Sequence, residues 1–111
     1  MHSNEICDLT NLTTNCLGNE TFIKKMIAVA IIEITSNITK LEENLTAGNV
    51  VEIKSIVHAL KPTIQNVANP DTFERVKSIE SGEVSENWQK QVATFISNLQ
   101  VLKTELMQQS A

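Results

Sequence analysis

The chain has 111 residues and a formal net charge of -4, and 41% of its residues are hydrophobic but only 4% aromatic. This length and composition predict one globular domain, residues 1–111, with a mainly aliphatic core. The acidic balance and the absence of a basic block argue against a partner made of nucleic acid.

The sequence gives no sign of export or of membrane insertion. No cationic segment followed by an apolar one opens the chain, so no signal peptide is expected. The apolar run 26–34 contains Glu33 and has about half the length that spans a bilayer. Cys7 and Cys16 have neither disulfide-framework nor metal-ligand spacing, which predicts free thiols. We therefore expect a cytoplasmic protein.

Helical periodicity dominates the chain, with apolar residues recurring at gaps of three and four. A short helix is expected within residues 6–17, and four longer ones at about 19–47, 49–67, 70–81 and 84–108. The intervening loops are short, which favours antiparallel neighbours. The predicted fold is all-α: an up-and-down antiparallel four-helix bundle with a short additional N-terminal helix.

Several residues predict where the helices begin and how they are covered. Asn19 and Asn49 are suited to N-cap positions, and Pro70 is suited to a first helical turn. Val29 and Ile32 lie off the main apolar stripe of the first long helix. We therefore expect a second side of that helix to be covered, with the N-terminal segment as the cover.

His58 lies in the second long helix and, at about 100° per residue, points roughly 140° away from the apolar stripe. Lys54, Lys61 and Gln65 share its exposed side. An imidazole beside cations suits an anionic group delivered by another protein, because neutral imidazole can attack phosphorus and form a phosphoramidate. Such a face suits neither a metal site nor a hydrolase triad. An ordinary surface histidine beside ordinary lysines is the alternative.

The sequence HALKP at 58–62 resembles the phosphorylation motif of histidine-containing phosphotransfer (HPt) domains, which is typically His-x-Leu-Lys-Gly. The resemblance extends over most of the chain. Residues 17–27 look like the family's Gly-Asp-rich helix start, 40–62 like its helix, turn and phosphoacceptor helix, and 73–80 like its next helix, which in the family often ends in Leu-Glu.

The resemblance implies roles for three residues. His58 would be the phosphoacceptor through Nε2, and Lys61 would neutralise the phosphoryl group. Many members of the family have a Gln or Glu on the next helix that binds the imidazole Nδ1–H, and here that position is Glu80. The alternative for Glu80 is a solvated glutamate at a helix end. Lys54 and Gln65 are expected to be solvated.

Pro62 departs from the family's glycine, which puts in doubt a docking geometry copied from typical members. It has no N–H for the carbonyl of His58, so the helix should bend there. Its ring faces away from the apolar stripe and should therefore not disturb the core. The expected docking face for a partner shares this outward orientation and comprises Val51, Ser55, Ala59, Pro62 and Gln65.

The function implied by the resemblance is that of a phosphorelay carrier. His58 would take a phosphoryl group from the aspartate of a response-regulator receiver domain and pass it to another receiver, with a hybrid sensor histidine kinase as a further class of partner. No cofactor of its own is expected, since the receiver would supply Mg²⁺. The chain has no Gly-rich nucleotide-binding motif, so it should not phosphorylate itself from ATP. With no large exposed apolar stripe evident, we expect a monomer.

Two alternatives stay open. One is a phosphorylation-independent docking bundle, a pseudo-HPt, whose activity would survive His58→Gln. The other is an unrelated helical adaptor in which HALKP is a coincidence, and there His58 would be buried or remote from Lys61. A small-molecule enzyme fits least, because no convergent set of titratable groups that needs a pocket is evident.

Overall fold

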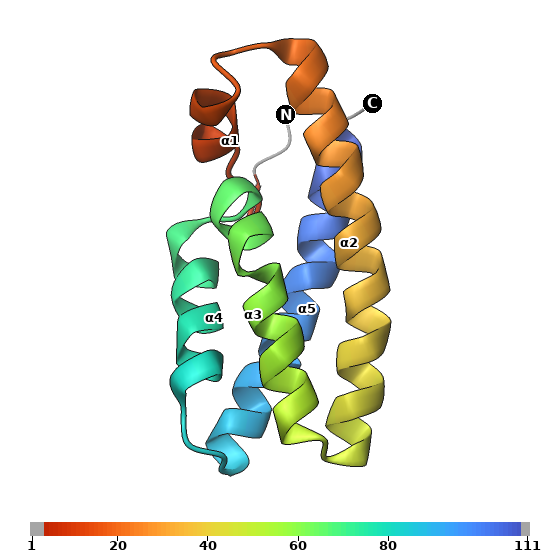
Figure 1. Ribbon diagram of the computed structural model, residues 1–111, viewed down its shortest axis with the longest axis vertical. Coiled ribbons are helices and arrows are strands. Elements are labelled where there is room, and N and C mark those ends of the chain that lie inside the picture. Colours follow the sequence, from red (N-terminus) through yellow and green to blue (C-terminus); the bar gives the residue numbers. More distant parts are fainter. Residues whose placement is uncertain (1–3, 110–111) are drawn as a thin grey trace.

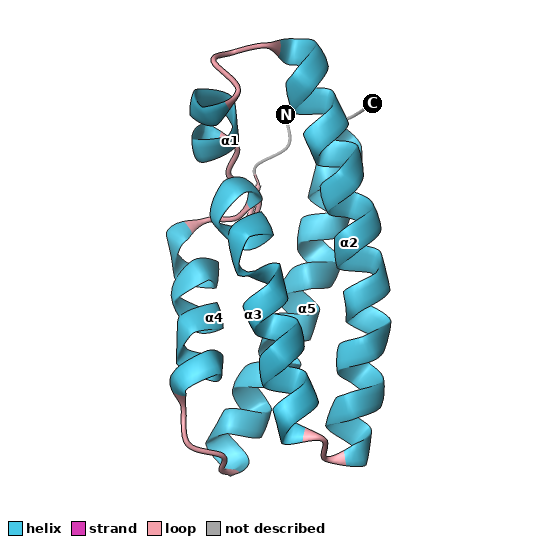
Figure 2. Cartoon of the chain, viewed as in Figure 1, coloured by secondary structure: helices cyan, strands magenta, loops and turns pink. Residues whose placement is uncertain are grey.

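The computed structural model describes residues 4–109, and nearly all of this range is helical (Figure 2). The predicted all-α class is confirmed, the bounds of the four longer helices lie within two residues of those expected, and the short N-terminal helix lies within the expected range 6–17. In chain order the helices are α1 (Thr10–Asn15), α2 (Glu20–Ala47), α3 (Val50–Val67), α4 (Pro70–Ser81) and α5 (Glu86–Gln109).

The four longer helices pack in a closed ring: α2 contacts α3 and α5, and α4 contacts the same two helices. Consecutive helices run in opposite directions along the long axis (Figure 1). That axis measures 42 Å, about the length of the 28-residue α2 at 1.5 Å per residue. The arrangement is compatible with the predicted up-and-down bundle. Within residues 4–109, no helix has the length and apolar character needed to cross a bilayer.

The core is aliphatic apart from two aromatic side chains of α5, Trp88 and Phe95. Burying apolar side chains on one stripe of each helix is the main driving force for packing of this kind. The largest fully buried aliphatic side chains come from the N-terminal segment and all four longer helices: Leu12, Ile34, Leu41, Ile53, Leu60, Ile64, Ile79, Leu99, Leu102 and Leu106.

The two predicted N-caps behave differently. The side chain of Asn19 accepts a hydrogen bond from the backbone N–H of Phe22 at 3.0 Å, as an N-cap should. Asn49 occupies the N-cap position of α3, but its amide donates instead to Asn44 Oδ1 at 3.0 Å. Between them, Gly48 ends α2 with a φ of 73°, a left-handed conformation that glycine adopts without strain.

The N-terminal segment is held on one side by a buried carboxylate of α5. Glu105 accepts hydrogen bonds from three consecutive backbone N–H groups, those of Glu5, Ile6 and Cys7. The Glu105 side chain is only 7% exposed. A buried charge is tolerated when it is fully hydrogen-bonded, and these donors satisfy it.

On its other side the N-terminal segment is bonded to the C-terminal end of α3. The backbone N–H of Asp8 donates to the carbonyl of Val67 at 2.9 Å, and Asn11 Nδ2 donates to the carbonyl of Gln65 at the same distance. These contacts place α1 against α3. The segment therefore closes one end of the core beside the helix that carries His58.

The expectation that the N-terminal segment covers a second side of α2 is wrong. Val29 and Ile32 are 55% and 71% exposed, and Phe22 on the same half of α2 is also exposed. The reason is that the backbone bonds of the N-terminal segment go to α3 and α5 rather than to α2. The first half of α2 therefore carries exposed apolar side chains where none were expected.

Cys7 and Cys16 are free and buried, in agreement with the prediction of free thiols. Cys7 precedes α1, and Cys16 follows its last residue. Burial, together with the negative charges of Glu105 and Asp8, raises the pKa of Cys7 to about 11. This thiol is therefore protonated and weakly nucleophilic at neutral pH.

Replacing Glu105 by Ala should lower the free energy of unfolding by about 3 kcal/mol, because three backbone N–H groups lose a charged acceptor. Urea unfolding followed by circular dichroism measures this change. Glu105→Gln, which keeps one acceptor oxygen, should lose less. Glu43→Ala, at an exposed position of α2, should change the stability by less than about 0.5 kcal/mol. If Glu105→Ala proved as stable as the wild type, this carboxylate would not be what holds the N-terminal segment.

Candidate functional site

The packing of α3 fixes where His58 points. Val57 directly precedes it, Leu60 lies two residues after it, and both are fully buried, so the helix cannot rotate without exposing core side chains. The His58 side chain is 73% exposed, as predicted from its position on the helix. A buried His58 would have favoured the alternative of an unrelated adaptor, but the ring is exposed.

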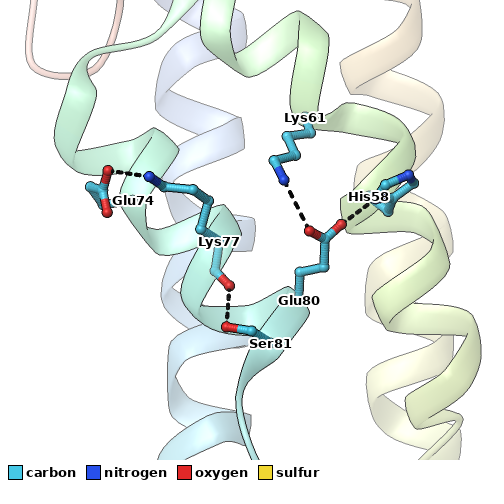
Figure 3. Close-up of polar contacts among 6 residues, drawn as sticks. All are labelled: His58, Lys61, Glu74, Lys77, Glu80 and Ser81. Carbon is cyan, nitrogen blue, oxygen red and sulfur yellow. Dashed lines mark hydrogen bonds and ion pairs between the residues drawn. The ribbon is translucent and has the colours of Figure 1, made fainter.

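A single carboxylate of α4 bridges two residues of α3. One oxygen of Glu80 is paired with His58 Nδ1, and the other accepts from Lys61 Nζ at 3.1 Å (Figure 3). The structure therefore brings together all three residues that the family resemblance singled out. Both carboxylate oxygens of Glu80 therefore have partners, while 26% of its side chain stays exposed.

This contact decides which nitrogen of His58 is available for chemistry. The hydrogen bonds from His58 and Lys61 hold the pKa of Glu80 below its ordinary value, so the carboxylate is ionised at neutral pH. An ionised carboxylate can only accept hydrogen bonds, which places the proton on Nδ1. In the neutral imidazole, Nε2 then carries the lone pair.

Capping and core packing place Glu80 opposite His58. Pro70 occupies the first turn of α4 as predicted, and Asn69 caps the helix by accepting from the N–H of Thr72 at 2.9 Å. Ile79 is fully buried. Because Glu80 directly follows Ile79, it lies about 100° further round the helix, at the edge that faces α3.

The predicted docking face is exposed along α3. Its members are two small side chains, one apolar side chain, one proline and one amide: Ser55, Ala59, Val51, Pro62 and Gln65. Val51 is 85% exposed, a large value for a valine. The helix continues through Pro62 from residue 50 to residue 67, and the expected bend at Pro62 stays a prediction.

A groove between α2 and α3 adjoins this face, with a volume of about 170 Å³. We call it the α2–α3 groove. Pro62, one helical turn from His58, forms part of its wall, and Glu33 of α2 accepts from Thr63 Oγ1 within it at 2.7 Å. The sequence did not indicate the groove, because Val29 was expected to be covered. The lining residues are Leu12, Met26, Val29, Ala30, Glu33, Pro62, Thr63, Asn66 and Val67.

Lys54 is not the solvated side chain that was expected. It is half-buried, and its Nζ donates to the backbone carbonyl of Gly82 at 2.8 Å. Gly82 is the residue that ends α4. The two residues are 28 positions apart, and neither helical periodicity nor a local motif could have indicated the contact.

No protein-family model, curated protein or solved structure matches this chain. The interpretation of the site therefore rests on its own residues and their geometry.

The Glu80 carboxylate should titrate below the ordinary glutamate pKa of about 4.3. His58→Ala and Lys61→Ala should each raise this pKa, because the hydrogen bond from His58 is the largest cause of the lowering and the bond from Lys61 is the next. Since the folded-state pKa is lowered, the contact stabilises the fold at neutral pH, and this contribution is lost as the pH falls through the folded-state pKa. Carbon-detected NMR of the side-chain carboxylates measures the titration.

Asp8 provides the control in the same spectra. Its pKa is lowered by the N–H and side chain of Thr10 and should not respond to either substitution. A Glu80 pKa that is the same in the wild type and in both variants would show that the bridge between α3 and α4 does not form in solution.

Proposed function

We propose that this chain is a phosphorelay carrier of the HPt kind. His58 accepts a phosphoryl group from the aspartate of a response-regulator receiver domain and passes it to another receiver. The observation that carries the proposal is the contact of Glu80 with His58 Nδ1, which leaves Nε2 as the nucleophilic nitrogen of an exposed imidazole. An imidazole held in one tautomer and open to a partner is what such a transfer needs.

The transfer balances without a further proton acceptor. The lone pair of His58 Nε2 attacks phosphorus, the N–P bond forms, and the P–O bond to the aspartate breaks, so that the carboxylate leaves with the electron pair. The proton stays on Nδ1, and the phosphorylated ring carries a positive charge beside Glu80. Because a cationic ring is a good leaving group, the same arrangement supports onward transfer to a second receiver.

Lys61 supplies the positive charge for the phosphoryl group in this proposal. It lies three residues after His58, on the same side of α3, and its side chain is one-third exposed. To contact an incoming phosphoryl group, its ammonium group would have to leave Glu80 Oε1. The receiver would bring the Mg²⁺ that the reaction requires, so the chain needs no cofactor of its own.

We also infer the finer architecture that suits this function. The ring of contacts among α2, α3, α4 and α5, with alternating directions, supports an up-and-down antiparallel four-helix bundle to which α1 is added. One domain spanning 1–111 would act as a cytoplasmic monomer, with receiver domains and a hybrid sensor histidine kinase as its partners.

The receiver docks over the exposed face of α3 and extends onto the α2–α3 groove. Small side chains at Ser55 and Ala59 allow close approach, and Val29 offers exposed apolar surface beside Pro62. An aspartyl phosphate is anionic, so its approach to His58 Nε2 should avoid both the Glu80 carboxylate and Glu33, which lies in the groove and accepts from Thr63. Apolar area beside a reacting group provides affinity without competing for the phosphoryl charge.

A phosphorylation-independent docking module is the second candidate. Pro62 in place of the family's glycine favours it, because a changed surface beside His58 could select a partner without any transfer. The transfer experiment separates the two candidates.

Mixing the protein with a radiolabelled, aspartyl-phosphorylated receiver from the same organism should label the wild type and leave His58→Gln unlabelled. The label should be acid-labile and base-stable, as expected for a phosphoramidate. Glu80→Ala should slow transfer roughly tenfold, because the imidazole loses the group that orients it.

Incubation of the protein with labelled ATP alone is the control for self-phosphorylation, and it should give no label. Transfer to His58→Gln at the wild-type rate would overturn the proposal. A folded wild type that takes label from none of the organism's receivers would instead favour the docking module.

Val29→Glu should slow transfer about tenfold at low receiver concentration and much less at saturation, because it weakens docking rather than chemistry. The position is exposed, so the fold should tolerate the change. Ile32→Glu is the matched control, since Ile32 is also exposed on α2 but does not line the groove. Equal effects of the two substitutions would show that the groove is not part of the docking surface.

A further inference from the structure

The position of Glu80 depends on how the C-terminal end of α4 is held. Glu80 is the second-last residue of α4, and the last turn of a helix has carbonyl groups without intrahelical partners. Such an end frays unless other elements bind it. Two side chains from outside α4 do so, one from α3 and one from α5.

The contact from α3 is made by Lys54. Its Nζ donates to the carbonyl of Gly82 at 2.8 Å, two residues beyond Glu80. Lys54 precedes His58 by four residues and Lys61 by seven, so the three side chains line one side of α3. This side of α3 therefore contacts the end of α4 at two points. Lys54 binds the carbonyl of Gly82, and His58 and Lys61 bind the carboxylate of Glu80.

The contact from α5 is made by Trp88. Its Nε1–H donates to the carbonyl of Ile79 at 2.9 Å, within the core. Ile79 directly precedes Glu80, so the backbone is fixed on both sides of the carboxylate. The Trp88 bond satisfies one of the last carbonyls of α4, and the Lys54 bond fixes the residue at which the chain leaves the helix.

Gly82 allows these elements to approach closely. A Cβ at this position would lie 2.5 Å from the carbonyl oxygen of Ser78 and 3.2 Å from Trp88 Cδ1. Its φ of -74° is open to any residue, so space rather than conformation requires glycine here. The last turn of α4 has no basic residue of its own, and Lys54 brings a positive charge to the negative end of the helix dipole.

We propose that Lys54 is a positioning residue for phosphotransfer. By binding Gly82 it holds the last turn of α4 against α3, and this keeps the Glu80 carboxylate on His58 Nδ1. Lys54 acts through Glu80 and does not touch the phosphoryl group. Its effect on transfer rests on the proposed function, whereas its effect on the imidazole does not.

The first test is the tautomer of His58, read by NMR of the nitrogen-labelled imidazole at about pH 8, where an ordinary imidazole is neutral. The wild type should show the tautomer protonated at Nδ1. Lys54→Gln should show a mixture of both tautomers, and Lys54→Arg, which keeps a cationic donor, should retain the wild-type pattern. Lys25→Gln, at an exposed position of α2, is the control for loss of one positive charge.

The second test is the rate of transfer from a phosphorylated receiver. Lys54→Gln should slow transfer about fivefold in the wild-type background, and Lys54→Arg should restore most of the rate. In a Glu80→Ala background, Lys54→Gln should have no further effect, because the group through which it acts is already gone. Circular dichroism checks that each variant is folded.

Two results would overturn the proposal. One is an unchanged His58 tautomer in Lys54→Gln, and the other is an equal loss of rate in both backgrounds, which would make Lys54 a direct phosphate contact. A failure of the proposed carrier function would give a different result from a failure of the positioning role. A wild type that takes no phosphoryl group, with a tautomer that still responds to Lys54→Gln, would refute the carrier role and support the positioning role.

Discussion

An exposed imidazole is free to rotate and to exchange its proton between two nitrogens, so surface exposure alone does not make a selective nucleophile. In this chain the contact between Glu80 and His58 removes that freedom without burying the ring. The carboxylate comes from α4 and the imidazole from α3, so the site exists only when the two helices are packed. The packing of α3 against α4, the capping of α4 and the contacts at its last turn all bear on this one pair.

The side chains of α3 that pack in the core and those of the candidate site lie on opposite sides of the helix. Val57 and Leu60 are fully buried on one side, while His58 and Pro62 face outward on the other. This separation explains why a proline is tolerated inside α3, since its ring disturbs neither the core nor the contact with α4. It also leaves the outward face exposed, and in the proposed function the shape of such a face would distinguish between similar partners.

The sequence was a good guide wherever one helix decides the outcome by its own periodicity. The helix bounds and the outward direction of His58 follow from apolar spacing. Glu80 was expected only from the resemblance to HPt domains. Helical periodicity does not predict contacts between polar groups that are far apart in the sequence. The bond of Lys54 to Gly82 and the three bonds of Glu105 therefore could not be foreseen. Val29 was misjudged for the same reason, because polar contacts elsewhere decide which side of α2 the N-terminal segment leaves open.

If His58 is phosphorylated as proposed, the shared carboxylate also has a consequence for the phosphorylated state. Before transfer, Glu80 faces two potential cations, the imidazole and the ammonium group of Lys61. Once Nε2 carries a phosphoryl group and Nδ1 keeps its proton, the ring becomes a full cation and attracts the carboxylate more strongly. Lys61 is then the more weakly held partner, at the moment when a dianionic group appears within its reach. In the proposed transfer, the ion pair that orders the site beforehand would thus release its lysine to the phosphoryl group afterwards, and the Glu80 carboxylate would keep a cationic partner in both states.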